Sequence, residues 1–208
     1  MTAFGKPKLS ILISGPSRTG KTTAANILAE RYGIPNKKIG EEFRKRTGID
    51  TSKFVTRPKE LDKELDETQS DMIRTASPDA PFILEARLAA YLASIERATR
   101  QLPIVTVLFW APEAERMERQ LRKVLRENPK SKATLDELRD GERDREAHDL
   151  ELWKEVHPEL DDKNVFDPGL TDQRGRPVYD LVIDTRIGMP AACADEVHDY
   201  LVKIGAFS

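Results

Sequence analysis

The stretch "GPSRTGKTT" occupies residues 15–23 and follows the apolar run "LSILIS" of residues 9–14. It fits the pattern G-x-x-x-x-G-K-[ST] at Gly15, Gly20, Lys21 and Thr22. The glycines allow a tight turn that brings backbone N–H groups close to a phosphate chain. The following "TTAANILAERYG" predicts a helix, whose positive N-terminal end would favour the same anion. The stretch therefore predicts a strand, a phosphate-binding loop and a helix in that order.

Individual residues of this loop have expected roles. In loops of this type the lysine reaches the β- and γ-phosphates of a nucleoside triphosphate, and the next hydroxyl binds Mg²⁺. Lys21 is therefore a candidate catalytic residue and Thr22 a candidate metal ligand. The expected phosphate-binding residues are Gly15, Ser17, Arg18, Thr19, Gly20, Lys21, Thr22 and Thr23. Arg18 stands where many such loops have a small residue, so it would lie either beside the phosphates or in solvent.

The rest of the chain carries further apolar runs of the strand type. They are "LSILISG" (9–15), "PFILEA" (81–86), "IVTVLFWA" (104–111) and "YDLVID" (179–184), and a fifth short strand is expected near 37–39. Each long run is nearly continuous rather than alternating, which is typical of buried parallel strands. Helical patterns lie between the runs. The sequence therefore predicts an α/β sheet with helices on both faces.

Start and stop signals place several helices. Gly33 should end the helix after the loop, and Pro112 should occupy the first position of another. Thr134 and Glu137 form a candidate capping box for a helix that runs to about Val156. Further helices are expected over 60–74 and 194–205, and the turn-rich segment 161–177 is expected to be a surface loop.

The front of the helix expected after Thr134, "LRDGERDREAHD" (138–149), is almost entirely charged. One interpretation is a solvated helix face with pairs at i and i+4, as charge runs usually are. The other is a lid over a polyphosphate, because arginines stabilise the charge that moves in phosphoryl transfer. Both interpretations remain open from the sequence.

Composition limits the class of protein. A chain of 208 residues is most simply one globular domain. With 34 basic and 36 acidic residues the net charge is −2, which argues against a general nucleic-acid surface. The single cysteine, Cys193, fits a reducing compartment and is expected to be a packing residue. We expect a cytoplasmic protein with a small-molecule nucleotide substrate and without nucleic-acid or membrane partners; monomer and homodimer both remain open.

Several motifs of other nucleotide-binding classes are missing. The sequence has no N-K-x-D motif, no strand ending in D-x-x-G and no LSGGQ, which argues against a switch GTPase or a transporter ATPase. Instead, arginines stand at the ends of expected elements. They are Arg44 near a helix start, Arg87 just past a strand, and Arg116, Arg119 and Arg122 on one helix. Transfer between two anions needs such positive groups.

These segments together resemble the nucleoside monophosphate kinases, most closely the compact cytidylate kinases. The segments are "ISGPSRTGKTTAANILAERYG", "IGEEFRKRTGID", "ELDKELDETQ", "FILEARLAAYL", "WAPEAERMERQ", "RDREAHDLELWKEV" and "YDLVIDT". They cover most of residues 9–157 and 178–186. Apart from the phosphate loop each motif is weak alone, and the specificity lies in their order and spacing.

The resemblance implies a P-loop NTPase fold with a five-stranded parallel sheet in a single domain spanning 1–208. Its core would comprise 9–39, 76–112 and 178–208, with a helical monophosphate-binding part over 40–75 and a lid over 113–157. The implied activity is transfer of the γ-phosphoryl group from ATP–Mg²⁺ to CMP or dCMP, giving ADP and a diphosphate.

The resemblance also assigns residues. Arg44 and Arg87 would grip the acceptor phosphate, and Asp62 and Gln69 would face its base or sugar. Arg119 and Arg145 would close over the ATP phosphates and act in catalysis with Lys21. No protein nucleophile is needed, because an oxygen of the acceptor phosphate attacks directly.

The chain departs from the family pattern at Ala86, which replaces a glycine, at Leu152, which replaces a second basic lid residue, and at Arg18. The base and sugar preference therefore stays open. Two alternatives remain. One is a P-loop kinase for another small-molecule acceptor, for which Asp62 could serve as base. The other is a non-catalytic nucleotide-binding regulator.

Overall fold

The computed structural model describes residues 5–41, 59–160, 163–186 and 188–207. Within them the chain forms one parallel sheet of five strands, in the order β2-β3-β1-β4-β5. The strands are β1 (Ser10–Ser14), β2 (Asn36–Lys38), β3 (Ile83–Glu85), β4 (Ile104–Trp110) and β5 (Leu181–Asp184). The predicted parallel sheet is confirmed. Most strands are slightly shorter than their apolar runs, because the ends of the runs continue into loops.

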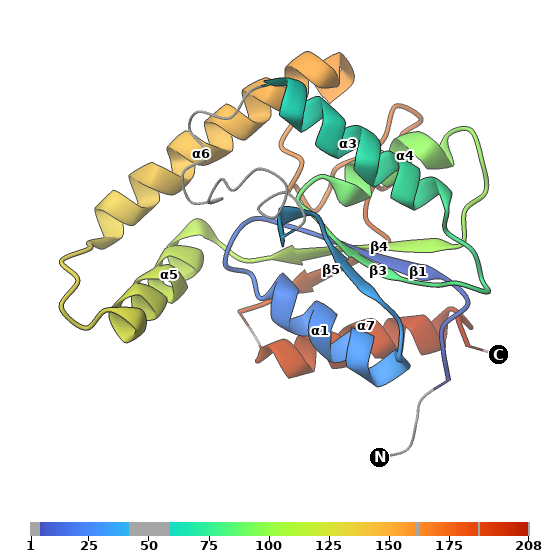
Figure 1. The fold of residues 1–208 in the computed structure, drawn as a ribbon, viewed down its shortest axis with the longest axis horizontal. Helices are drawn as coiled ribbons and strands as arrows, with labels where there is room; N and C mark the ends of the chain where they lie inside the picture. Colours follow the sequence, from blue (N-terminus) through green and yellow to red (C-terminus); the bar gives the residue numbers. More distant parts are fainter. Residues whose placement is uncertain (1–4, 42–58, 161–162, 187, 208) are drawn as a thin grey trace.

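Helices cover both faces of the sheet, as expected (Figure 1). One face carries α1 (Lys21–Tyr32) and α7 (Pro190–Lys203), and the other carries α3 (Lys59–Arg74) and α4 (Ala89–Arg97). Successive residues of a strand point to opposite faces. Ile11 and Ile13 therefore pack towards α1 and α7, whereas Leu12 belongs to the core on the other face. The continuous apolar runs reflect this burial on both sides.

The phosphate-binding loop joins the carboxyl end of β1 to α1, the edge at which open α/β sheets bind ligands. Gly20 is the N-cap of α1, and Gly33 is its C-cap with a left-handed φ of 62°. The Gly33 N–H donates to the carbonyl oxygen of Ala29 and so closes the last turn. The predicted end of this helix is confirmed.

Two helices form a hairpin that projects from the carboxyl edge of the sheet (Figure 1). They are α5 (Glu113–Glu127) and α6 (Leu135–Val156). The predicted capping box starts α6: the Thr134 N–H donates to Glu137 Oε2 at 2.9 Å, and the Glu137 N–H donates to Thr134 Oγ1 at 3.3 Å. The prediction for Pro112 was wrong by one position. Its ψ of 149° is extended, so Pro112 is the N-cap of α5.

The segment after α6 differs from its prediction as a surface loop. A short 3₁₀ turn, η2 (Pro158–Leu160), leads into it, and its residues 161–162 lie outside the described residues. Val165, Phe166 and Leu170 are buried in the core cluster that also contains Trp153. Side chains of Asn164, Asp167 and Asp172 accept hydrogen bonds from nearby backbone N–H groups. These local turns satisfy the backbone, which lets the apolar residues between them point inward.

Over the residues that the structure describes, no helix combines the length and the apolar character needed to cross a membrane.

Candidate active site

The backbone conformation of the phosphate-binding loop explains why glycine is required at position 15. Gly15 has a φ of 141°, and a Cβ there would overlap the carbonyl oxygen of Phe109 on β4. Only glycine lets β1 and β4 approach this closely at the start of the loop. Arg18 takes a left-handed φ of 65°, which among the described non-glycine residues occurs only here. Its side chain is exposed, whereas Thr19 beside it is buried.

Lys21 folds back against the loop. Its Nζ donates to the carbonyl oxygen of Pro16 at 2.6 Å, and Thr19 Oγ1 donates to the same oxygen at 3.0 Å. Burial lowers the pKa of Lys21 to about 7; nearby Glu85 raises the pKa, while Arg87 and Arg145 lower it further. The lysine therefore lies among charges from β3 and from α6, two elements that are distant in sequence.

Thr22 and Glu85 bring a hydroxyl and a carboxylate together. Thr22 Oγ1 donates to Glu85 Oε1 at 2.6 Å. These are the oxygen ligands that Mg²⁺ prefers. The described residues contain no group of three or more His, Cys, Asp or Glu side chains that could hold a metal ion.

Glu85 was missed in the sequence analysis. The sequence feature that could have identified Glu85 is an acidic residue near the end of the apolar run "PFILEA". This position puts Glu85 at the carboxyl edge of the sheet.

Arg119 links α5 to the loop and to the end of β5. Its Nη2 donates to the carbonyl oxygen of Thr185 at 2.7 Å, and its Nη1 donates to Thr185 Oγ1 at 3.0 Å and to the Arg18 carbonyl oxygen at 3.4 Å. Beside it lies a cavity of about 820 Å³ that the loop, α5 and the start of α7 line. Cys193 lines this cavity but is 3% exposed, which confirms the prediction of a packing residue.

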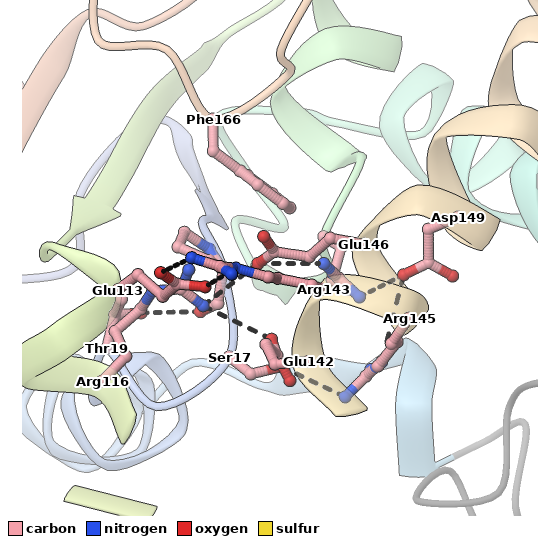
Figure 2. Close-up of polar contacts among 12 residues, drawn as sticks. Ser17, Thr19, Glu113, Arg116, Glu142, Arg143, Arg145, Glu146, Asp149 and Phe166 are labelled. Atoms are coloured by element: carbon pink, nitrogen blue, oxygen red, sulfur yellow. Dashed lines mark hydrogen bonds and ion pairs between the residues drawn. The ribbon is translucent and has the colours of Figure 1, made fainter. Parts of the chain in front are cut away.

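Arg145 and Asp149 bring α6 to both sides of the site. Arg145 Nη1 donates to Ser17 Oγ in the loop at 3.1 Å. One turn later, the buried carboxylate of Asp149 accepts a hydrogen bond from Arg87 Nη1. Figure 2 shows Ser17, Arg145 and Asp149 gathered with other charged side chains of the hairpin. The charged stretch thus faces the phosphate-binding loop with one side of the helix.

A second arginine, Arg116 of α5, holds the hairpin together. Its Nη1 lies 3.0 Å from Glu146 Oε1 and 3.4 Å from Glu142 Oε1, and the Arg116 residue is 5% exposed. Glu146 also lies 3.9 Å from Arg87 Nη2. Burial raises the pKa of Glu146, while Arg116 and Arg87 lower it. These carboxylates had no expected role from the sequence, because their partners lie on other elements.

The structure brings together the loop residues, Lys21, Arg87, Arg119 and Arg145, but it places Gln69 differently. Gln69 is buried on α3, where its Nε2 donates to Asp66 Oδ1 at 3.1 Å and its Oε1 has no described hydrogen-bond partner. Arg44 and the side chain of Asp62 lie outside the described residues.

The structure shows the surroundings of Ala86 and Leu152, two residues that depart from the family pattern. Ala86 does not have a positive φ, so the position requires no glycine for its backbone. Its N–H donates to the carbonyl oxygen of Ile13 at 3.2 Å, and its own carbonyl oxygen accepts from Ser14 Oγ at 3.1 Å. Leu152 is 8% exposed and is part of the hydrophobic core.

Comparison with solved structures supports the fold. A shikimate kinase from Acinetobacter baumannii superposes with a TM-score of 0.56 at 16% identity, covering 95% of this chain and 94% of that one. A gluconokinase from Sinorhizobium meliloti gives 0.55 at 16% identity, covering 96% and 94%. At this identity the likeness shows a shared fold.

Sequence comparison identifies the family. A family described as an AAA domain matches residues 14–139. The cytidylate kinase of Methanocaldococcus jannaschii is 32% identical over 182 residues, which cover 84% of this chain and 87% of that protein. That of Methanothermobacter thermautotrophicus is 30% identical over 164 residues, covering 76% and 91%. Because relatives of this identity match most of the chain, and most of their own length, the chain belongs to the cytidylate kinase family of P-loop kinases and is a nucleoside monophosphate kinase.

Proposed function

We propose that the protein transfers the γ-phosphoryl group of ATP, with Mg²⁺, to CMP or dCMP and releases ADP and the diphosphate. The observation that carries this proposal is the convergence of Lys21, Arg87 and Arg145 from three separate elements. Transfer between two anionic phosphates requires positive groups on the donor, on the acceptor and around the moving group. The cytidylate kinases among the relatives indicate the cytosine acceptor.

The donor side of the site would bind ATP. The loop residues and Lys21 would hold the phosphates, and Arg119 borders the cavity beside them. Thr22 and Glu85 would hold Mg²⁺, which when bound neutralises phosphate charge. The cavity of about 820 Å³ offers room for the base and ribose.

The acceptor side centres on Arg87. Its Nη1 is hydrogen-bonded to Asp149, but among the described residues its buried Nε and Nη2 have no hydrogen-bond partner, and Nη2 lies 3.9 Å from Glu146 Oε1. A guanidinium with unsatisfied buried donors is suited to a phosphate, which accepts such bonds in pairs. Arg44, Asp62 and Gln69 stand in the matching family motifs, and we assign them to the acceptor phosphate and nucleoside.

Catalysis would rest on position and charge rather than on a protein nucleophile. An oxygen of the acceptor phosphate attacks the γ-phosphorus, and ADP leaves. Lys21, Arg119 and Arg145 would stabilise the negative charge in the transition state. The lid, residues 113–157, and the acceptor-binding part, residues 40–75, would close over both substrates, exclude water and so suppress ATP hydrolysis.

The test measures ADP formation from ATP–Mg²⁺ with CMP, dCMP, UMP, AMP, GMP and dTMP. We expect turnover on the cytidine nucleotides and its loss in Lys21→Ala. Arg87→Met should raise the KM for CMP about 10- to 100-fold, because hydrogen bonds to charged groups are lost, and leave the KM for ATP unchanged. Arg100→Met is the matched control, an arginine whose partner Glu96 lies on α4. The proposal would be overturned if none of these nucleotides were phosphorylated, or if the phosphoryl group were transferred only to a hydroxyl group of an acceptor and not to its phosphate.

A further inference from the structure

Two aromatic rings lie against the guanidinium of Arg87. Arg87 Cζ is 5.1 Å from the centroid of the Phe166 ring and 5.6 Å from that of Trp153. The rings are buried, and their centroids are 6.2 Å apart with planes at 82°. Figure 2 shows the Phe166 ring pointing at the cluster of charged side chains. No role for Phe166 follows from the phosphate loop or from the arginine motifs.

Arg87 has two kinds of support. Asp149, Glu146 and Trp153 all lie on α6, the helix that would move when the lid opens. Phe166 lies on the following segment, so it supports Arg87 from outside α6, although its ring also packs edge-on against Trp153. It would still support the guanidinium while substrates enter and leave.

The backbone around Phe166 is well anchored. The Phe166 N–H donates to Asn164 Oδ1 at 2.9 Å, and the neighbouring carbonyl oxygen of Val165 accepts a hydrogen bond from the buried hydroxyl of Tyr179. The Val178 N–H donates to the Leu170 carbonyl oxygen at 2.9 Å and closes the segment. These bonds fix the ring in the core rather than leaving it on a free surface loop.

We propose that Phe166 is a positioning residue for the acceptor-phosphate arginine, and that the segment 163–177 serves to place it. A planar guanidinium stacks favourably on an aromatic face, and the attraction is stronger where water is excluded. The ring carries no strong hydrogen-bond acceptor, so it orients Arg87 without engaging the Nε and Nη2 donors that the acceptor phosphate needs. This inference rests on the proposed role of Arg87 in acceptor binding.

Steady-state kinetics and calorimetric CMP binding test the proposal in Phe166→Leu, Phe166→Tyr and the wild type. Phe166→Leu should raise the KM and Kd for CMP about tenfold, with the KM for ATP unchanged, and Phe166→Tyr should retain near wild-type values. Leu170→Ala is the control for a loosened segment, since Leu170 packs in the same core cluster. It should lower the Tm without changing the KM for CMP.

A double-mutant cycle with Arg87→Met decides whether the ring acts through the arginine. If it does, Phe166→Leu adds nothing to the loss that Arg87→Met already causes. Additive losses, or an unchanged Kd for CMP in Phe166→Leu, would overturn this inference while leaving the proposed function intact. If Arg87→Met itself leaves CMP binding unchanged, the assignment of Arg87 fails, and this inference fails with it.

Discussion

The surroundings of Lys21 should make ATP binding depend on pH. Burial lowers its pKa to about 7, so at slightly alkaline pH the ligand-free protein holds it largely neutral. A bound triphosphate would place several negative charges beside it and raise the pKa again. Binding of ATP should therefore be coupled to uptake of a proton.

We expect calorimetry at about pH 8, in buffers of different ionisation enthalpy, to show uptake of close to one proton when an ATP analogue binds. At about pH 6 the lysine is already charged, and uptake should be near zero. Affinity should fall by up to about tenfold per pH unit above pH 7. Lys21→Met should abolish the uptake, while Lys123→Met, which changes a lysine in the same cavity, should retain it. Buffer-independent heats at pH 8 would contradict this.

The same pKa shift affects stability with a defined sign. The folded-state pKa of about 7 lies below the ordinary value of 10.5, so the unfolded chain binds more protons between these two pH values. The contribution of Lys21 to the unfolding free energy of the ligand-free protein therefore increases as pH rises through this window. Bound ATP would remove this dependence, because it raises the folded-state pKa.

At the level of residues, the sequence predicted the positions that local backbone geometry requires. It did not predict the side-chain contacts that form only when distant segments meet at the edge of the sheet. Gly15 and Lys21 could be identified because the loop pattern encodes backbone space and phosphate contact. Glu85 and Thr185 could not, since their contacts with Thr22 and Arg119 depend on strand register and helix placement. Such pairs are separated by more than sixty residues and leave no periodic signal.

Among the elements, the α5–α6 hairpin is linked by the buried Arg116 and, nearer its surface, by Glu113 of α5 with Arg139 and Arg143 of α6. Arg116 faces two carboxylates, Glu142 and Glu146, and little of its side chain is exposed. Removing Arg116 would take the ion-pair partner from Glu142 and leave Glu146 only its longer contact with Arg87, and losing one partner of a buried ionic group costs more than the pair contributes.

Arg116→Met should therefore lower the free energy of unfolding by about 3 kcal/mol, measured by urea denaturation. Adding Glu142→Gln and Glu146→Gln to this variant should recover most of the loss, because both carboxylates that faced Arg116 are then neutral and Arg87 keeps its pair with Asp149. Arg122→Met is the matched control on the same helix; its side chain is 68% exposed, so little change is expected. A triple variant less stable than Arg116→Met would show that the network stabilises the hairpin beyond charge neutralisation.

The elements also show why some structure could be predicted from the sequence and some could not. The capping box and the glycine C-cap are local signals, and both helix ends lie where these signals placed them. The prediction of a surface loop was wrong for residues 163–177, because turn-forming residues are as frequent there as in an exposed loop. Val165, Phe166 and Leu170 are too irregularly spaced to show a strand or helix period, and only the folded structure shows that they belong to the core cluster that contains Trp153.

Across the whole molecule, α6 connects the two halves of the site. Arg145 contacts Ser17 of the phosphate loop, and Asp149, one turn away, contacts Arg87, which we propose to bind the acceptor phosphate. Because one helix contacts both places, it offers a route for coupling between the proposed binding of ATP and that of the acceptor. Such coupling is reciprocal: each ligand must change the affinity of the other by the same factor.

We expect CMP and a non-hydrolysable ATP analogue to tighten each other's binding by a common factor in the range of about 5- to 150-fold, measured by calorimetry in both orders of addition. Asp149→Asn should bring this factor close to one, because it removes the buried charge of α6 that is hydrogen-bonded to Arg87, whereas Glu146 lies further from the guanidinium at 3.9 Å. Glu151→Gln is the control, an exposed carboxylate on the same helix, and it should keep the wild-type factor. If Asp149→Asn kept the full factor, coupling would have to run through another element; the contact between His157 and Asp66 of α3, 3.2 Å apart, would then be the next route to test.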